Sequence, residues 1–215
     1  MPIIGEKEQQ QIREMLQGMS GPVSMLVFTQ EGCAACAQTQ QLVTELAALS
    51  DHLSATIHDI QAEPAQAERY GIDKVPAIAL VGQKDYGVRF FGLPTGYEFG
   101  AFVEDLVDVS RGAAALGKKT QEYLAQITRP VRIQVFTTPI CPVCPNMVRT
   151  AHKLAIESDL IRAEGIDATE FGELAEKYGV QSVPRTIVNE KLIFDGLIPE
   201  GKFLLEIAKA ANQGG

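Results

Sequence analysis

The sequence lacks several features that would assign it to a functional class directly. No apolar run approaches the roughly 18 residues that a membrane-spanning helix needs. No G-x-G-x-x-G or P-loop pattern is present, which disfavours built-in nucleotide or flavin chemistry. The first residues, MPIIGEKEQQQ, have neither a basic segment nor a long apolar segment, so they do not resemble a secretory signal. We therefore expect a cytoplasmic protein that has no membrane partner.

Positive charge is also scarce. The chain has 19 Lys and Arg residues against 27 Asp and Glu residues, which gives a formal net charge of −8. Nucleic-acid binding usually requires a basic patch, so we expect no nucleic-acid partner. With 215 residues, 46% of them hydrophobic and 21% charged, the composition is that of a soluble globular protein. This length accommodates two domains of about 100 residues each.

Cysteine is rare, and its placement is informative. The four cysteines all lie in two Cys-x-x-Cys pairs, Cys33/Cys36 and Cys141/Cys144. Structural disulfides are rare in a reducing cytosol, where cysteines in such pairs are more often catalytic or metal-bound. The composition alone leaves both of these possibilities open.

The two pairs belong to an internal repeat with a period of 108 residues. Of the 55 residues from Pro22 to Pro76, 19 are identical to the residue 108 positions further along, whereas chance gives roughly one match in fifteen. A period of this size indicates two similar domains rather than a solenoid. We predict domains at 1–112 and 113–215. The short joint near Arg111–Leu116 suggests that the two units pack together.

Each copy has the same predicted order of elements: helix, strand, Cys-x-x-Cys helix, strand, helix, X-Pro, two strands and helix. Alternation of strands with helices argues for an α/β fold with parallel pairing by right-handed crossovers. Short apolar and β-branched runs bounded by chain-breaking residues predict the strands. The predicted strands are 23–29, 54–60, 76–81, 90–91, 131–137, 161–167, 184–188 and 192–194, and the predicted helices include 6–18, 34–50, 114–127 and 142–158.

A Cys-x-x-Cys pair between a strand and a helix has a defined chemical use. The free N–H groups and the dipole at a helix N-terminus stabilise a thiolate on the first cysteine, and the thiolate is the attacking species. The second cysteine, one helical turn on, can resolve a mixed disulfide. We therefore predict Cys33 and Cys141 as nucleophiles and Cys36 and Cys144 as resolving thiols.

Both copies also carry an X-Pro pair 43 residues after the first cysteine, Val75-Pro76 and Val183-Pro184. A Cys-x-x-Cys pair, a strand ending in Asp, and Tyr-Gly-[Ile/Val]-x-x-Val-Pro together resemble the thioredoxin/glutaredoxin superfamily. The resemblance implies that both prolines are cis and lie against the dithiols, where they and the preceding valines contact the substrate.

The tandem arrangement narrows the resemblance. Two such units, with FTTPICPVCPNMVRTAHKLAIE in the second, are similar to the glutaredoxin-like protein disulfide oxidoreductases of archaea and thermophilic bacteria. This implies two tandem thioredoxin-like domains, each of three α/β/α layers with a mixed sheet. It also implies an enzyme that reduces, oxidises or shuffles disulfides of protein substrates, often with electrons from a flavoprotein thioredoxin reductase. Redox-active disulfides would be its only redox groups, with no other cofactor and no metal.

The two sites differ in sequence, so we expect them to differ in activity. The first site is Cys-Ala-Ala-Cys, with Glu31 two residues before it, and this negative charge should oppose formation of the Cys33 thiolate. In the second site Pro142 suits helix position N1. We predict that Cys141 has the lower pKa and that the C-terminal site carries most of the activity.

One family feature is missing. Thioredoxin places a buried acid six residues before its first cysteine, where this chain has Val27 and Val135. If resolution needs a proton relay, another group or a water molecule must provide it, and the sequence does not identify which. Asp59 and Asp167, which recur at the ends of strands, are interpreted as strand-end caps. Arg185 is either a contact for an acidic or glutathione-like partner or a solvated surface charge.

Three alternative functions remain. Paired Cys-x-x-Cys motifs can bind zinc, although zinc ribbons usually place their pairs about 15–20 residues apart. The two prolines could present a peptide-binding edge of a chaperone module without turnover. The chain could also be a redox shuttle domain of a flavoprotein peroxide reductase system. In that arrangement only one unit is expected to keep its dithiol, whereas both units keep it here.

Overall fold

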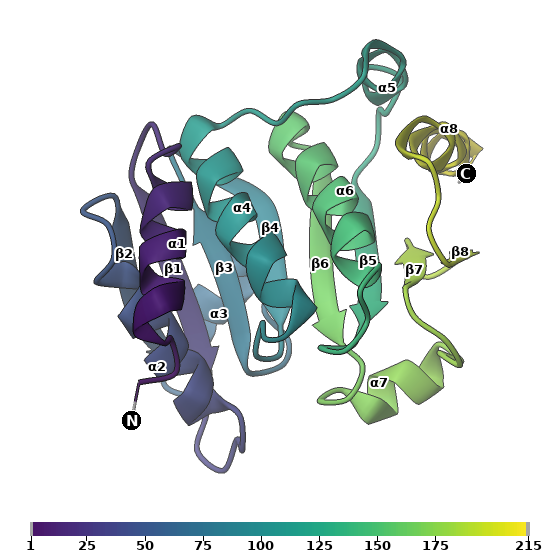
Figure 1. Ribbon diagram of the computed structural model, residues 1–215. Coiled ribbons are helices and arrows are strands. Elements are labelled where there is room, and N and C mark those ends of the chain that lie inside the picture. The colour runs from purple at the N-terminus through teal and green to yellow at the C-terminus, as the bar shows by residue number, and fades with distance from the viewer. Residues whose placement is uncertain (1, 214–215) are drawn as a thin grey trace.

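The computed structural model describes residues 2–213, which form one continuous sheet of eight strands with helices on both of its faces (Figure 1). The strand order is β2-β1-β3-β4-β6-β5-β7-β8, so each half of the chain contributes four neighbouring strands. The strands are β1 (Val23–Thr29), β2 (Leu53–Asp59), β3 (Ala77–Val81), β4 (Asp85–Phe91), β5 (Val131–Thr137), β6 (Ile161–Asp167), β7 (Arg185–Val188) and β8 (Leu192–Asp195).

The two halves repeat one topology. In each half the first strand pairs in parallel with the second and antiparallel with the third, and the third and fourth strands pair antiparallel. This mixed sheet is the predicted fold class, two tandem thioredoxin-like units. The helices are α1 (Glu6–Leu16), α2 (Cys36–Ala47), α3 (Pro64–Tyr70), α4 (Tyr97–Arg111), α5 (Lys118–Leu124), α6 (Cys144–Glu157), α7 (Gly172–Lys177) and α8 (Glu200–Gln213).

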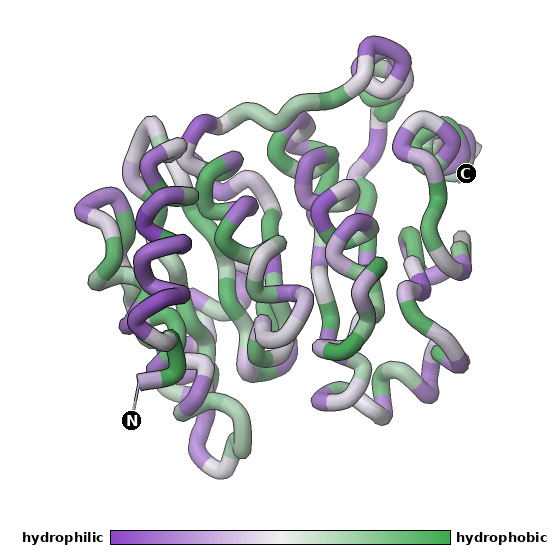
Figure 2. Tube along the Cα trace, in the orientation of Figure 1, coloured by the Kyte–Doolittle hydropathy of each residue, from purple (hydrophilic) through white to green (hydrophobic). Residues whose placement is uncertain are grey.

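The helices bury both faces of the sheet and so produce three layers. Residues of α1, α2, α4, α6 and α8 form one large apolar core with one sheet face. Residues of α3 and α7 form a second core with the opposite face. Figure 2 shows the strands as mostly hydrophobic, whereas the outward side of α1 is hydrophilic. The first strand of each half is buried along almost its whole length, as its content of apolar and β-branched residues predicts.

The halves join through β4 and β6, which pair in parallel from Val88↔Ala163 to Phe91↔Ile166. Above this seam α4 packs on α6, where the fully buried Asp105 meets two residues of the other unit. Asp105 forms an ion pair with Arg149, and its Oδ2 lies 2.6 Å from His152 Nδ1. The expectation that the units pack together is therefore confirmed, while the boundary at 112/113 stays a prediction.

The segment between the units is more extended than predicted. A helix was expected over 114–127, but α5 spans only Lys118–Leu124. In the segment before α5, backbone N–H groups donate hydrogen bonds to side chains from other elements: Ala114 N–H donates to Glu157, and Gly117 N–H donates to Glu200. These bonds hold the segment in an extended path. Strand β4 is also longer than the predicted 90–91, because it begins at Asp85.

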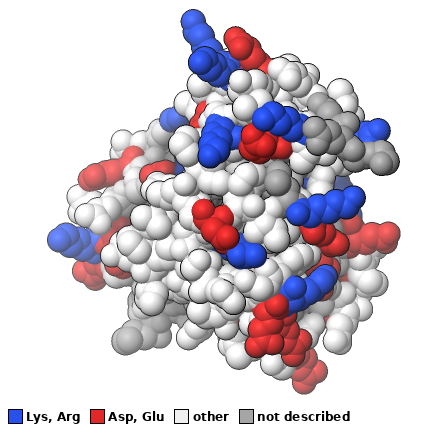
Figure 3. All heavy atoms as spheres, turned by 90° about the vertical axis from the view of Figure 1, so that its right-hand side faces the viewer, with Lys and Arg blue, Asp and Glu red and all other residues white. Residues whose placement is uncertain are grey.

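None of the helices in the described part of the chain is long and apolar enough to span a bilayer. On the face that contains β7, β8 and α8, basic and acidic side chains are interspersed (Figure 3). Within the hairpin of β7 and β8, the guanidinium of Arg185 lies 2.7 Å from Asp195. This ion pair holds the side chain within the hairpin, while its buried Nε atom has no hydrogen-bond partner among the described residues. Contact with an acidic partner stays a prediction.

Candidate active sites

Two disulfides occupy equivalent places in the two units. Cys33 is bonded to Cys36 and Cys141 to Cys144, with Cα–Cα separations of 5.4 and 5.5 Å. Each pair lies between the first strand of its unit and the helix that begins at the second cysteine. Both second cysteines are buried, whereas Cys33 is half-buried and Cys141 is 8% exposed. The cysteine more open to solvent in each pair is thus the predicted nucleophile.

Each disulfide lies against its X-Pro segment. The Val75–Pro76 and Val183–Pro184 peptide bonds are both cis, as predicted. The Cys141 sulfur lies 4.0 Å from the carbonyl oxygen of Val183. In the first unit Cys33 lines a pocket of about 250 Å³ together with Val75 and Pro76. The structure therefore brings all eight predicted site residues together in two sets, while their roles in exchange stay predictions.

The helices that follow the disulfides begin later than predicted. The N-caps are Ala35 and Val143, so the first helical residues are Cys36 and Cys144. The assignment of Pro142 to position N1 is wrong, because this residue precedes the cap, and Pro145 lies in the first turn instead. The second cysteine therefore contributes the helix's first free N–H group.

That N–H group acts differently in the two sites. Cys144 N–H donates to the Cys141 sulfur at 3.2 Å. In the first site Cys36 N–H instead donates to the carbonyl oxygen of Cys33 at 3.4 Å, and no hydrogen bond reaches the Cys33 sulfur from residues 2–213. Among these residues, the C-terminal site alone has a donor directed at the nucleophilic sulfur.

The surfaces around the sites also differ. Exposed apolar side chains flank the second disulfide: Ile140 is 84% exposed and Val143 is 40% exposed. The first disulfide is preceded by the exposed polar residues Gln30 and Glu31. We infer that the second site has the more apolar rim.

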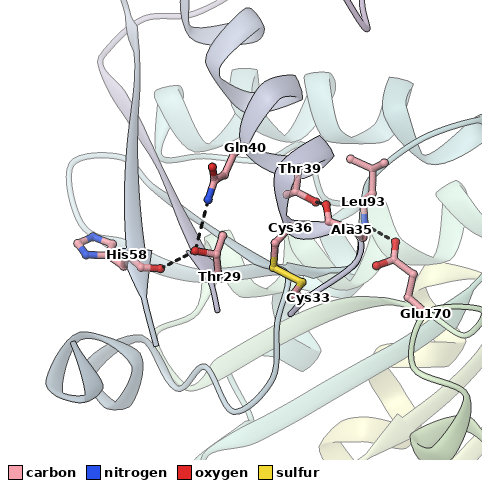
Figure 4. The surroundings of a disulfide bond; sticks show 9 residues. All are labelled: Thr29, Cys33, Ala35, Cys36, Thr39, Gln40, His58, Leu93 and Glu170. Carbon is pink, nitrogen blue, oxygen red and sulfur yellow. Dashed lines mark hydrogen bonds between the residues drawn. A yellow bond between two sulfur atoms is a disulfide. The ribbon is translucent and has the colours of Figure 1, made fainter. Parts of the chain in front are cut away.

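Figure 4 shows the first disulfide between two polar groups from different parts of the fold. On one side Thr29 accepts a hydrogen bond from Gln40 at 3.4 Å and donates to the carbonyl oxygen of His58 at 3.3 Å. On the other side Glu170, which belongs to the second unit, accepts a hydrogen bond from Leu93 N–H at 2.7 Å. Burial and the nearby Asp167 raise the pKa of Glu170, against the effect of the Leu93 N–H group.

A buried acid lies at the seam between the units. Glu98, in the first turn of α4, is 7% exposed, and its Oε1 has no hydrogen-bond partner within the described chain. Burial, with Asp105 and Asp167 nearby, raises the pKa of Glu98 to about 8. A small cavity, large enough for one water molecule at about 20 Å³, joins Glu98 to Thr137 and Pro139, which closely precede the second dithiol.

A signal for Glu98 was present in the sequence. Glu98, Phe102 and Asp105 are separated by four and three residues, so both acids lie on the apolar face of the helix. Charged residues are almost never fully buried unless they are paired or functional. Val27 and Val135, at the usual position of the acid, are fully buried apolar residues.

The remaining polar candidates have structural roles. Asp59 caps its strand end by accepting hydrogen bonds from Gln61 N–H and Ala62 N–H, and Asp167 does the same with Thr169. This agrees with their interpretation as strand-end caps. Within residues 2–213, no cluster of three or more His, Cys, Asp or Glu side chains has a geometry that could hold a metal ion.

Comparison with known proteins agrees with this geometry. The thioredoxin domain family matches residues 23–104 and 131–209. The crystal structure of a protein disulfide oxidoreductase from Aeropyrum pernix K1 is 30% identical, with a TM-score of 0.90 over 97% of this chain and 94% of that chain. The N-terminal domain of alkyl hydroperoxide reductase AhpF from Enterococcus faecalis has the same fold, with a TM-score of 0.87 at 23% identity over 94% of this chain and 99% of that chain.

Curated relatives include much longer proteins. An alkyl hydroperoxide reductase component of Pseudomonas aeruginosa is 27% identical over 59% of this chain. This chain spans only 24% of the length of that relative, and 32% of a Bacillus subtilis NADH dehydrogenase that is 24% identical over 78% of this chain. With two disulfide sites in two repeated units, and a relative that is 30% identical along nearly its full length, the chain belongs to the thioredoxin domain family, in the tandem group that includes the Aeropyrum protein disulfide oxidoreductase.

Proposed function

We propose that the protein is a thiol–disulfide oxidoreductase that exchanges electrons with disulfides of protein substrates through both Cys-x-x-Cys sites. The observation that carries the proposal is the position of each disulfide, between a helix N-terminus and a cis-prolyl segment, with the first cysteine on the solvent side. A sulfur anion at a helix N-terminus is stabilised by free N–H groups and by the helix dipole.

The exchange at the C-terminal site involves two displacements. The Cys141 thiolate attacks one sulfur of the substrate disulfide, forms a mixed disulfide and releases the other substrate sulfur as a thiol. Cys144, after loss of its proton, then attacks Cys141, forms the Cys141–Cys144 disulfide and releases the second substrate thiol. The substrate disulfide gains two electrons and the protein dithiol loses two. In the reverse direction the same steps oxidise a substrate dithiol.

Glu98 is suited to accept the proton that Cys144 must lose. It is buried, its Oε1 has no partner among the described residues, and its cavity is also lined by Thr137 and Pro139, which precede Cys141 by four and two residues. Its pKa of about 8 lies close to that of an ordinary thiol, so proton transfer between the two groups is nearly balanced. General acid–base groups work best when their pKa lies near the operating pH.

The C-terminal site is proposed to carry most of the activity. The Cys144 N–H group already contacts the Cys141 sulfur, and a donor to the anion lowers the thiol pKa. The exposed Ile140 and Val143 also provide an apolar surface for a protein substrate. At the first site, Glu31 and Glu170 place negative charge near Cys33, which opposes thiolate formation.

A redox shuttle in a flavoprotein system is the second candidate. The similarity to components of alkyl hydroperoxide reductases favours it. The two dithiols would then pass electrons between a flavoprotein reductase and an acceptor protein, and the same exchange chemistry applies. Both candidates need no redox group beyond the two disulfides, and a cytoplasmic location stays a prediction.

Insulin reduction by Cys33→Ser and Cys141→Ser variants, together with the reduction potential of each remaining site, tests the proposal. We expect Cys141→Ser to lose most of the turnover and Cys33→Ser to lose less. Greater loss in Cys33→Ser would overturn the dominance of the C-terminal site. If neither variant lost turnover relative to the parent protein, the enzyme assignment would be wrong and a peptide-binding role would replace it.

A further inference from the structure

The first dithiol opens into a pocket whose chemistry differs from that of the second site. Its volume is about 250 Å³, which is room for one side chain rather than a segment of chain. The walls beside Cys33 are small and apolar, and the one charged residue lining it is Glu170. The complete lining is Gln30, Cys33, Ala34, Ala35, Val75, Pro76 and Glu170.

Glu170 is held in place by both units. It follows β6, and its own N–H donates to the carbonyl oxygen of Asp167 at 3.2 Å. Its carboxylate Oε1 accepts the Leu93 N–H group at 2.7 Å, and Leu93 follows the strand that pairs with the cis-proline strand. The second carboxylate oxygen, Oε2, has no hydrogen-bond or ion-pair partner among residues 2–213. One oxygen therefore anchors the group and the other is free for a ligand.

The second site has no equivalent of this acid within the described chain. The two units lie close together at Gly92. A methyl group added there would lie 2.8 Å from Asp167 Cβ and 3.2 Å from Glu170 Oε1. At Gly196, the matching glycine of the second unit, an added methyl group would meet nothing within 4 Å among the described residues. Only the first unit has a following unit beside its fourth strand, and this following unit places Glu170 in the pocket that Cys33 lines. Glu98 of the first unit differs, because the lining of its cavity includes neither Cys141 nor Cys144.

We propose that Glu170 makes the Cys33–Cys36 site selective for substrate disulfides that carry a Lys or Arg side chain beside the reacting cysteine. This inference deepens the proposed function and rests on it. The aliphatic stem of such a side chain packs on the apolar walls, as Lys and Arg stems commonly do, and its cationic head reaches the free carboxylate oxygen. Acidic partners, glutathione among them, are disfavoured at this site by repulsion from Glu170 and from the exposed Glu31.

Single-site proteins and paired substrates test this selectivity. The Cys141→Ser/Cys144→Ser protein retains only the first dithiol, and the Cys33→Ser/Cys36→Ser protein retains only the second. Each is assayed with two disulfide-linked fluorogenic peptides that differ only in Lys or Glu next to the cysteine. The first-site protein should prefer the Lys peptide in kcat/KM by about fivefold, the upper range for a solvent-exposed ion pair.

Substitution of Glu170 identifies the cause of the preference. In the first-site protein, Glu170→Gln should bring the Lys/Glu ratio close to one and Glu170→Lys should invert it. The matched control, Glu173→Gln, removes an exposed acid on the next helix that does not line the pocket, and it should leave the ratio unchanged. In the second-site protein, Glu170→Gln should have no effect on the ratio.

A direct attack assay separates selectivity from turnover. In a Cys36→Ser/Cys141→Ser/Cys144→Ser protein, Cys33 is the one cysteine left, and its stoichiometric attack on the two peptides, each activated as a mixed disulfide with nitrothiobenzoate, is followed by absorbance. A faster reaction with the Lys peptide that Glu170→Gln abolishes supports the inference. Attack at equal rates on both peptides, or a preference that survives Glu170→Gln, overturns it and leaves the proposed function standing. If neither single-site protein reduces either peptide, the proposed function itself is wrong.

Discussion

Substitution of Glu98 by Gln gives a quantitative test of the seam between the units. Glu98 has an ordinary pKa of 4.5 in the unfolded chain and a pKa of about 8 in the folded protein, mainly because burial disfavours its charged form. The folded protein therefore binds one more proton than the unfolded chain between these two pH values. The contribution of protonated Glu98 to the free energy of unfolding is fully present below pH 4.5. It is lost as the pH rises toward 8, because the folded protein must then either keep the proton or bury the charge.

The size of the effect follows from the pKa difference. Between these two values, each unit of pH increase lowers the free energy of unfolding of the parent protein by about 1.36 kcal/mol. At pH 7, which is 2.5 units above 4.5, the accumulated cost is about 3 kcal/mol. The Gln side chain has the same shape and no charge, so it removes this pH dependence and leaves only a constant difference in hydrogen bonding.

Urea unfolding of the parent and of Glu98→Gln between pH 4.5 and 8 measures this difference. The free energy of unfolding of the variant relative to the parent should grow with pH by about 3 kcal/mol up to pH 7. Glu14→Gln, which changes a solvent-exposed acid of α1, should show no such growth. A relative stability that is flat across the range, or that grows as the pH falls, would refute the burial argument.

Three further predictions concern the seam and the substrate surface. Asp105→Ala leaves Nδ1 of the fully buried His152 without its partner and removes one of the three carboxylates paired with Arg149, and thermal or urea unfolding should show a loss of about 1–3 kcal/mol. Gly92→Ala and Gly196→Ala share the strain of a positive φ, but only the former meets atoms of a neighbouring segment. Its unfolding free energy should therefore fall by about 1–3 kcal/mol more, and equal losses would contradict the packing at the seam. Ile140→Ser should lower kcat/KM for insulin by about tenfold, the effect of one lost apolar contact, and it should change little for a small-molecule disulfide, because no charge is added beside Cys141. Equal loss on both substrates would argue against a docking role.

Much of the fold follows from local patterns in the sequence. The strands at 23–29 and 131–137 were predicted with their observed bounds, because each is rich in apolar and β-branched residues and is bounded by chain-breaking residues. The strand at 161–167 was predicted with its observed bounds from its place in the alternation of strands and helices. The repeat of 108 residues assigns the same topology to both halves. The eight cysteine, valine and proline site positions were identified for the same reason, since they recur in register with the repeat.

The relation between the two units could not be predicted in this way. The pairing of β4 with β6 occurs once, so the repeat gives no information about it. The positions of Glu98 and Glu170 depend on this pairing: each belongs to one unit and lines a cavity near the other unit's dithiol. A single sequence contains no direct signal of contacts over such distances along the chain.

The helix starts were misjudged for a more local reason. The Ala-Ala and Pro-Val pairs between the cysteines are compatible with a helical first turn, and Pro142 in particular suits position N1. In the structure these residues lie before the first helical residue, and the helices begin at Cys36 and Cys144. This shift places the Cys144 N–H group on the Cys141 sulfur, a contact that the sequence suggested only in outline.

The central claim is that both dithiols exchange electrons with protein disulfides, and a single-turnover stoichiometry tests it most directly. Fully reduced protein is mixed with excess oxidised insulin, quenched with acid, alkylated and weighed by mass spectrometry. The account predicts that each chain loses all four thiols while two insulin disulfides are reduced, with Cys141 and Cys144 oxidised before Cys33 and Cys36. Four free thiols remaining on each chain after prolonged mixing would contradict it.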